Sequence, residues 1–188
     1  MEKKMRQFAT YLVLAMMLAL LLGTPALTMG WDDGGVALRA RLRGVEEVPA
    51  VSTTGTGEFR GKANKDGTEI DYELTYTLEG AVQQAHIHIG QNGVNGGIVL
   101  FLCTNLGNAP ATVPAPPACP ASPGEVSGTL TAANVVVQGS QGISAGEFSE
   151  ILRAIRRGVA YVNVHSSPNH GGGEIRGQIK ARGHDDDD

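Results

Sequence analysis

Aromatic residues, cysteines and long apolar runs are all scarce in this sequence. Aromatic residues make up 5% of the 188 positions, and only two cysteines are present. Lys and Arg (15) are outnumbered by Asp and Glu (19), which gives a formal net charge of −4. Because nucleic-acid-binding proteins need a basic face, we expect no nucleic-acid partner.

Motifs that would indicate catalysis are also missing. The sequence contains no nucleophile elbow, no glycine-rich phosphate-binding loop and no convincing Ser/His/Asp arrangement. An acid–base pair requires two groups with separated pKa values in a cleft, which a sequence does not reveal. We therefore favour a protein that is not an enzyme.

The one uncharged apolar stretch, Tyr11–Leu22, lies near the N-terminus. It follows a short positive segment and precedes the small residues Gly23–Ala26, in the order typical of a secretory signal peptide. A dozen apolar residues are too few for a membrane-spanning helix, which needs about 20. We predict a signal peptide over residues 1–30 and a mature protein that is secreted, periplasmic or on the cell surface, with no membrane span. A retained N-terminal anchor is the alternative.

Cys103 and Cys119 are the only two cysteines. In an exported chain they are expected to form a disulfide, because the compartment is oxidising. The bridge would close much of the Pro- and Ala-rich segment Thr104–Gly124, which we interpret as an irregular surface loop. A metal-binding pair or a reactive thiol is the alternative.

The 26 glycines indicate many tight turns, and several segments alternate apolar and polar residues. Such alternation is typical of strands with one buried face. The predicted strands are Val36–Arg43, Glu69–Tyr76, Val82–Ile89, Ile98–Cys103, Glu125–Thr131, Val159–Val164 and Gly173–Lys180. One short amphipathic helix is predicted after Ser144, which has capping-box spacing with Glu147, and it ends near Gly158.

Four pieces of the sequence, in order, resemble the CHRD (chordin-type) domain family, and the fourth consists of two nearby segments. They are Leu42–Pro49, Ala85–Gly90, Asn95–Val99, Tyr161–His165 and Gly172–Ile179. The resemblance implies an exported β-sandwich or barrel of immunoglobulin-like appearance. Together with the alternating segments and the helix pattern, it leads us to expect an all-β fold, an antiparallel β-sandwich or barrel (immunoglobulin-like or superoxide-dismutase-like) with one short helix. We place this domain at residues 31–182 and expect the acidic tail, 183–188, to be disordered.

The resemblance says less about activity. In chordin-like proteins the module belongs to antagonists of growth-factor signalling, but this chain has one copy and no von Willebrand-type modules, so that role is not expected. Glu47, Glu174 and Arg176 are charged members of the matching segments, and we interpret them as structural ion pairs or backbone anchors.

His86, His88 and His165 give the strongest indication of chemistry. Residues two apart in a strand point the same way, so His86 and His88 share a face opposite their apolar neighbours. His165 likewise lies opposite the apolar face of its own strand. If these strands are adjacent, three neutral imidazoles with an open fourth position suit Zn²⁺ or Cu²⁺.

Other interpretations of the histidines stay open. All three can instead make structural hydrogen bonds on a half-buried polar face. His170 can supply a fourth ligand or remain solvated in its turn. His184, beside Asp185–Asp188, can bind cations weakly or be part of a solvated tail.

Three functional hypotheses follow. The first is an exported binding or structural module that holds copper or zinc through His86, His88 and His165. The second is a copper-dependent redox enzyme resembling superoxide dismutase, although no bridging-histidine loop is present in the sequence. The third is adhesion to an unidentified protein or surface through a sheet face alone.

Overall fold

The computed structural model describes residues 34–182. The predicted signal peptide, residues 1–30, and the predicted disordered tail, 183–188, lie outside the described residues. No helix within residues 34–182 is long and apolar enough to cross a membrane.

The strands are β1 (Val36–Arg43), β2 (Thr56–Ala63), β3 (Glu69–Thr77), β4 (Ala81–Ile89), β5 (Ile98–Thr104), β6 (Gly124–Thr131), β7 (Ala160–Ser167), β8 (His170–Gln178) and β9 (Lys180–Arg182). The helices are α2 (Phe148–Arg156) and three 3₁₀ turns, η1 (Gly44–Glu46), η2 (Ala132–Asn134) and η3 (Gly139–Gln141).

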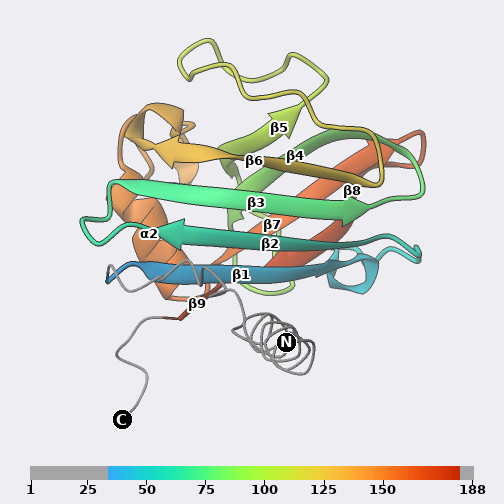
Figure 1. Cartoon of the computed structure of the whole chain (residues 1–188), viewed down its shortest axis with the longest axis horizontal. Coiled ribbons are helices and arrows are strands. Elements are labelled where there is room, and N and C mark those ends of the chain that lie inside the picture. The colour runs from blue at the N-terminus through green and yellow to red at the C-terminus, as the bar shows by residue number, and fades with distance from the viewer. Residues whose placement is uncertain (1–33, 183–188) are drawn as a thin grey trace, which may run out of the picture. The chain divides into compact units, whose positions relative to one another are not determined.

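The strands form one antiparallel sheet that curls into a nearly closed barrel (Figure 1). Their order is β5-β4-β7-β8-β1-β2-β3-β6, and β9 pairs with the start of β1. The two ends of this order approach each other, because β5 contacts β6. The Tyr72 hydroxyl on β3, the neighbour of β6, also donates a 2.7 Å hydrogen bond to the Leu102 carbonyl on β5. The predicted all-β fold with one short helix is therefore confirmed.

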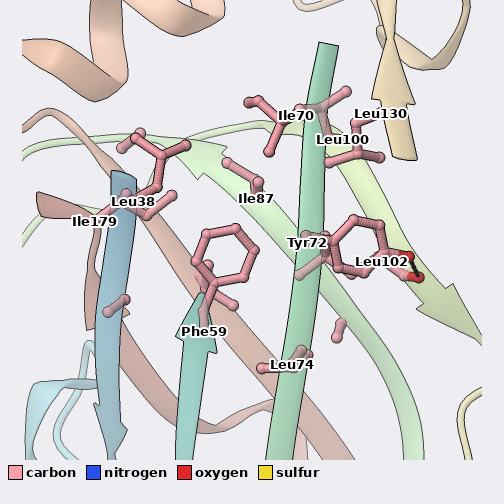
Figure 2. Packing of buried hydrophobic residues seen from close by; sticks show 14 of the residues in the cluster. Leu38, Phe59, Ile70, Tyr72, Leu74, Ile87, Leu100, Leu102, Leu130 and Ile179 are labelled. Carbon is pink, nitrogen blue, oxygen red and sulfur yellow. Dashed lines mark hydrogen bonds between the residues drawn. The ribbon is translucent and has the colours of Figure 1, made fainter. Parts of the chain in front are cut away.

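The inward-facing residues of the strands build a single apolar core (Figure 2). Leu38, Phe59, Leu74, Ile87 and Leu100 are each at most 1% exposed. Burial of such a side chain contributes about 1.5–3 kcal/mol. Since every second residue of these strands points inward, the residues between them lie on the outer wall, where the histidines are found.

The structure differs from the sequence-based expectation at β2 and at the start of α2. Strand β2 was missed because Gly57 and Gly61 stand where apolar residues would reveal the alternation. A Cβ at Gly57 would lie 2.9 Å from the Ile175 side chain, so the glycine leaves room for the core. The predicted Ser144 cap is wrong: the helix begins at Phe148 without a side-chain cap, and Ser144 instead donates its backbone N–H to Glu147.

The predicted disulfide joins Cys103 on β5 to Cys119 in the long β5–β6 loop. Asn105 supports the same loop: its side-chain amide donates to the Cys119 carbonyl and accepts from the Cys119 N–H, both at 3.0 Å. Asn105 also bonds to β4, because its backbone N–H donates to the Gln83 carbonyl (2.8 Å) and its side chain donates to the Val82 carbonyl (3.0 Å). The disulfide and these bonds fix the loop to the barrel, as expected for a loop that belongs to the domain.

Glu174 on β8 is a buried carboxylate that joins three separate segments. It is 0% exposed, and its Oε1 accepts hydrogen bonds from the Thr53 hydroxyl (2.8 Å) and the Glu79 N–H (2.9 Å). Its Oε2 accepts from the Ser166 hydroxyl. Because a buried charge is tolerated only when hydrogen-bonded, Glu174 acts as the backbone anchor that its motif suggested.

Removal of the disulfide is expected to destabilise the fold. The bridge spans a sequence separation of 16 residues. Closing a loop of that size lowers the entropy of the unfolded chain, which stabilises the folded state by about 3 kcal/mol. Urea unfolding of Cys103→Ala/Cys119→Ala should show a loss near this value, and reduction of the parent protein should give a similar loss. A change below ~0.5 kcal/mol would contradict the expected role.

Glu174→Gln should lower the free energy of unfolding by about 2 kcal/mol, because one carboxylate oxygen becomes an NH₂ group that faces donors. The matched control is Glu125→Gln, an exposed change on β6, which should stay within ~0.5 kcal/mol of the parent. Equal stability of the two variants in urea titrations would disprove the anchoring role.

Candidate metal centre

The three predicted histidines come together on the outer wall of the barrel. Strands β4 and β7 pair antiparallel, with His86 opposite Asn163 and Gln84 opposite His165. One potential ligand atom of each of His86, His88 and His165 lies within 4.8 Å of those of the other two. The two strands that carry the histidines are therefore adjacent, a point that the sequence left undecided.

This part of the outer wall is buried rather than half-buried. The exposed fractions of His86, His88 and His165 are 0%, 7% and 7%. The His86 ring meets Phe101 of β5 edge-to-face, with 4.5 Å between centroids, and the His88 ring stacks on Tyr161 of β7 at 4.7 Å. Two aromatic side chains therefore flank the cluster.

Backbone carbonyls fix the proton position on two of the imidazoles. His88 Nδ1 lies 2.9 Å from the Gly96 carbonyl, and His165 Nδ1 lies 2.9 Å from the Gly171 carbonyl. A carbonyl only accepts hydrogen bonds, so each Nδ1 carries the proton of a neutral ring. The lone pair of each ring is then on Nε2, and a carbonyl at the other ring nitrogen is the usual support of a metal-binding histidine.

His86 has no such partner. Both of its ring nitrogens are buried and make no hydrogen bond. A buried polar atom without a partner carries a desolvation cost of about 1–3 kcal/mol, so the purely structural interpretation does not account for this residue. The unpaired nitrogens face a cluster of other nitrogen ligands.

The imidazoles are neutral at physiological pH. Burial lowers the pKa of His86 to about 2, with smaller contributions from His165 and His88. Burial also lowers the pKa of His88 to about 4, against the opposing effect of the Gly96 carbonyl, and it lowers that of His165. Neutral imidazole is the form that binds a metal ion.

Asn163 and Glu47 extend the site beyond the predicted ligands. Asn163 Oδ1 lies 3.0 Å from His88 Nε2 and 3.2 Å from His165 Nε2. Burial raises the pKa of Glu47 to about 6, although the Val48 backbone, Arg176 and the Asn163 side chain stabilise its charged form. Asn163 is two residues before His165 and so shares its strand face, but nothing in the sequence pattern indicates its contact with two imidazoles.

Arg176 holds the loop that covers the site. Its guanidinium donates to Asn95 Oδ1 (3.0 Å) and to the Val94 carbonyl (2.9 Å), and it lies 3.4 Å from the centroid of the Tyr161 ring. The Gly96 carbonyl that orients His88 belongs to the same loop. Arg176 is therefore a backbone anchor, as the motif suggested, and the loop that it holds also sets the tautomer of His88.

The other candidate positions do not join the cluster. His170 begins β8 opposite Ser166 and is not part of the histidine group, whereas His184 lies outside the described residues. A surface hollow of about 660 Å³ lies over β1, β2 and β3, lined by residues such as Arg41, Glu58 and Thr75. The hollow is an open sheet face with charged residues, and none of the three histidines lines it.

Comparison with known sequences identifies the family. No curated protein matched the chain. The sequence model of the CHRD domain family matches residues 38–179, a region that contains the three histidines together with Glu47, Asn163 and Arg176. This match extends over most of the barrel, so the chain belongs to the CHRD domain family.

Proposed function

We propose that this protein is an exported binding module that holds one copper or zinc ion through His86, His88 and His165. The observation that carries the proposal is the state of His86, whose two ring nitrogens are buried without any hydrogen-bond partner. Its neighbours His88 and His165 have their Nδ1 atoms engaged by carbonyls, which leaves their Nε2 lone pairs for a cation.

The donor set agrees with these metals. Imidazole nitrogen suits Zn²⁺ and Cu²⁺, whereas Mg²⁺ and Ca²⁺ prefer oxygen ligands. The ligands stand on β4 and β7, which pair along their length, and rigid strands hold ligand positions more accurately than loops do. Export, whether to the periplasm or to the outside of the cell, is part of the proposal and agrees with the disulfide.

The redox-enzyme and adhesion hypotheses gain less support. Among residues 34–182, the three histidines are the single group of metal-ligand type, so a two-metal arrangement like that of copper–zinc superoxide dismutases has no counterpart there. Adhesion through the outer sheet face would not use the histidines, and it leaves the unpaired nitrogens of His86 without an explanation.

Metal content is the direct test. Protein purified without an affinity tag and loaded with Zn²⁺ or Cu²⁺ should retain about one equivalent after desalting, measured by elemental mass spectrometry. His86→Ala/His88→Ala/His165→Ala should retain none. Binding should also stabilise the parent by about 2.7 kcal/mol when free metal is at 100 times the dissociation constant.

His170→Ala is the matched control, because His170 is a histidine on β8 that does not belong to the cluster. This variant should bind the metal like the parent. Circular dichroism establishes that each variant is folded. Failure of the folded parent to retain either metal would disprove the proposed function.

The acid sensitivity of the metal-free protein should depend on His86. Below pH 6.5 the unfolded chain protonates this residue, whereas the folded protein, with a pKa of about 2, does not. The unfolded state therefore binds more protons, and stability falls as the pH falls. Between pH 7 and pH 5, this single group accounts for a loss of about 2 kcal/mol.

We therefore expect the parent to lose about 2 kcal/mol more than His86→Phe between these two pH values, as measured by urea unfolding in the presence of a chelator. Glu47, whose raised pKa acts in the opposite direction, is present in both proteins, so its contribution cancels. Parallel pH profiles for the two proteins would show that His86 is not held neutral by burial.

A further inference from the structure

The Asn163 side chain lies between two of the three imidazoles. Its Oδ1 atom is 3.0 Å from His88 Nε2 and 3.2 Å from His165 Nε2. Because both rings carry their proton on Nδ1, where a carbonyl accepts it, neither Nε2 has a hydrogen to donate to the amide oxygen. Three electron-pair donors thus face one another, an arrangement that a cation between them stabilises.

An amide has a second orientation, in which NH₂ faces the imidazoles and the oxygen faces away. The Glu47 carboxyl group favours one of these two orientations of the Asn163 amide. Its carboxyl group interacts with the Asn163 side chain in a way that favours the charged form, and a carboxylate only accepts hydrogen bonds. In the structure Oδ1 faces the imidazoles, and the Glu47 carboxylate favours this orientation because it can accept from the amide NH₂ group but cannot donate to the amide oxygen.

The position of Glu47 is built into the fold. Gly173 adopts φ +128°, and a Cβ there would lie 2.3 Å from Glu47 Oε1, so any larger residue would displace the carboxyl group. Glu47 is only 6% exposed, and its Oε1 has no hydrogen-bond partner. Arg176 supplies a stabilising positive charge. The Glu47 carboxylate is therefore held in one buried position, where the Asn163 side chain is one of its neighbours.

We infer that Asn163 Oδ1 is the fourth ligand of the metal ion and that Glu47 is the positioning residue that directs it. This inference rests on the proposed three-histidine site. Three imidazole nitrogens and one oxygen complete the four positions that zinc normally takes. A full ligand set is characteristic of sites that hold a metal, whereas catalytic sites keep one position open for water or substrate.

Co²⁺ is a suitable probe, because its visible absorption is intense with four ligands and weak with five or six. The parent should bind one Co²⁺ with the intense spectrum. Asn163→Ala should bind about 10–100-fold more weakly, with a weaker spectrum because water enters the site. Glu47→Gln keeps the size of the side chain but removes the charge that orients the amide, so it should bind about 10-fold more weakly.

Two further variants separate positioning from general damage to the fold. In Glu47→Gln/Asn163→Asp, either orientation of the new carboxylate presents an oxygen, so the intense spectrum should return. Glu125→Gln, an exposed change of the same chemistry on β6, should match the parent in affinity and spectrum.

The possible results distinguish the two proposals. No Co²⁺ binding by the folded parent would disprove the three-histidine site itself. Binding by the parent, with Asn163→Ala and Glu47→Gln equal to it in affinity and spectrum, would overturn the role of Asn163 and Glu47 and leave the three-histidine site standing. Weaker binding by both variants, with the spectrum recovered in the double variant, is the expected result.

Discussion

A polar group that leaves water must find a partner inside the protein, and the outer wall formed by β4, β7 and β8 is governed by that requirement. Most of the buried polar groups on this wall find a hydrogen-bond partner within the protein. Glu174 accepts three hydrogen bonds, and Arg176 donates to the loop of residues 90–97. In contrast, both ring nitrogens of His86 and the Oε1 atom of Glu47 have no hydrogen-bond partner. Both groups neighbour Asn163, because His86 lies opposite it in the β4–β7 register and the Glu47 carboxyl group interacts with its side chain.

The covering loops turn a polar sheet face into a buried site. A strand that faces solvent can carry histidines at no cost, and such histidines would keep their ordinary pKa values. Here Arg176 draws the loop of residues 90–97 over the wall, and the Gly96 carbonyl of that loop reaches His88. The same contact therefore removes His88 from water and selects its tautomer. The burial of His88 and the choice of its tautomer therefore have a common structural cause.

Much of the fold was accessible from the sequence, because strict alternation identifies strands with one apolar face. This succeeded for β1, β3 and β4, and it also placed His86 and His88 on the face opposite the core. It failed for β2, where Gly57 and Gly61 replace the apolar residues. Strand order and the covering loops depend on contacts between distant segments, so local periodicity could not show that His165 lies beside the other two or that all three are buried.

The proposed site is suited to retention of a metal rather than to turnover. An enzyme centre needs a coordination position that water or substrate can reach, but Phe101 and Tyr161 flank the imidazoles and Asn163 Oδ1 fills the space between two of them. Burial also excludes the solvent that exchanges ligands. A cation with three neutral imidazoles leaves its positive charge in a low-dielectric region, where an isolated ion is costly. Glu47 would supply a negative charge beside the proposed site, although the neighbouring Arg176 guanidinium offsets part of it.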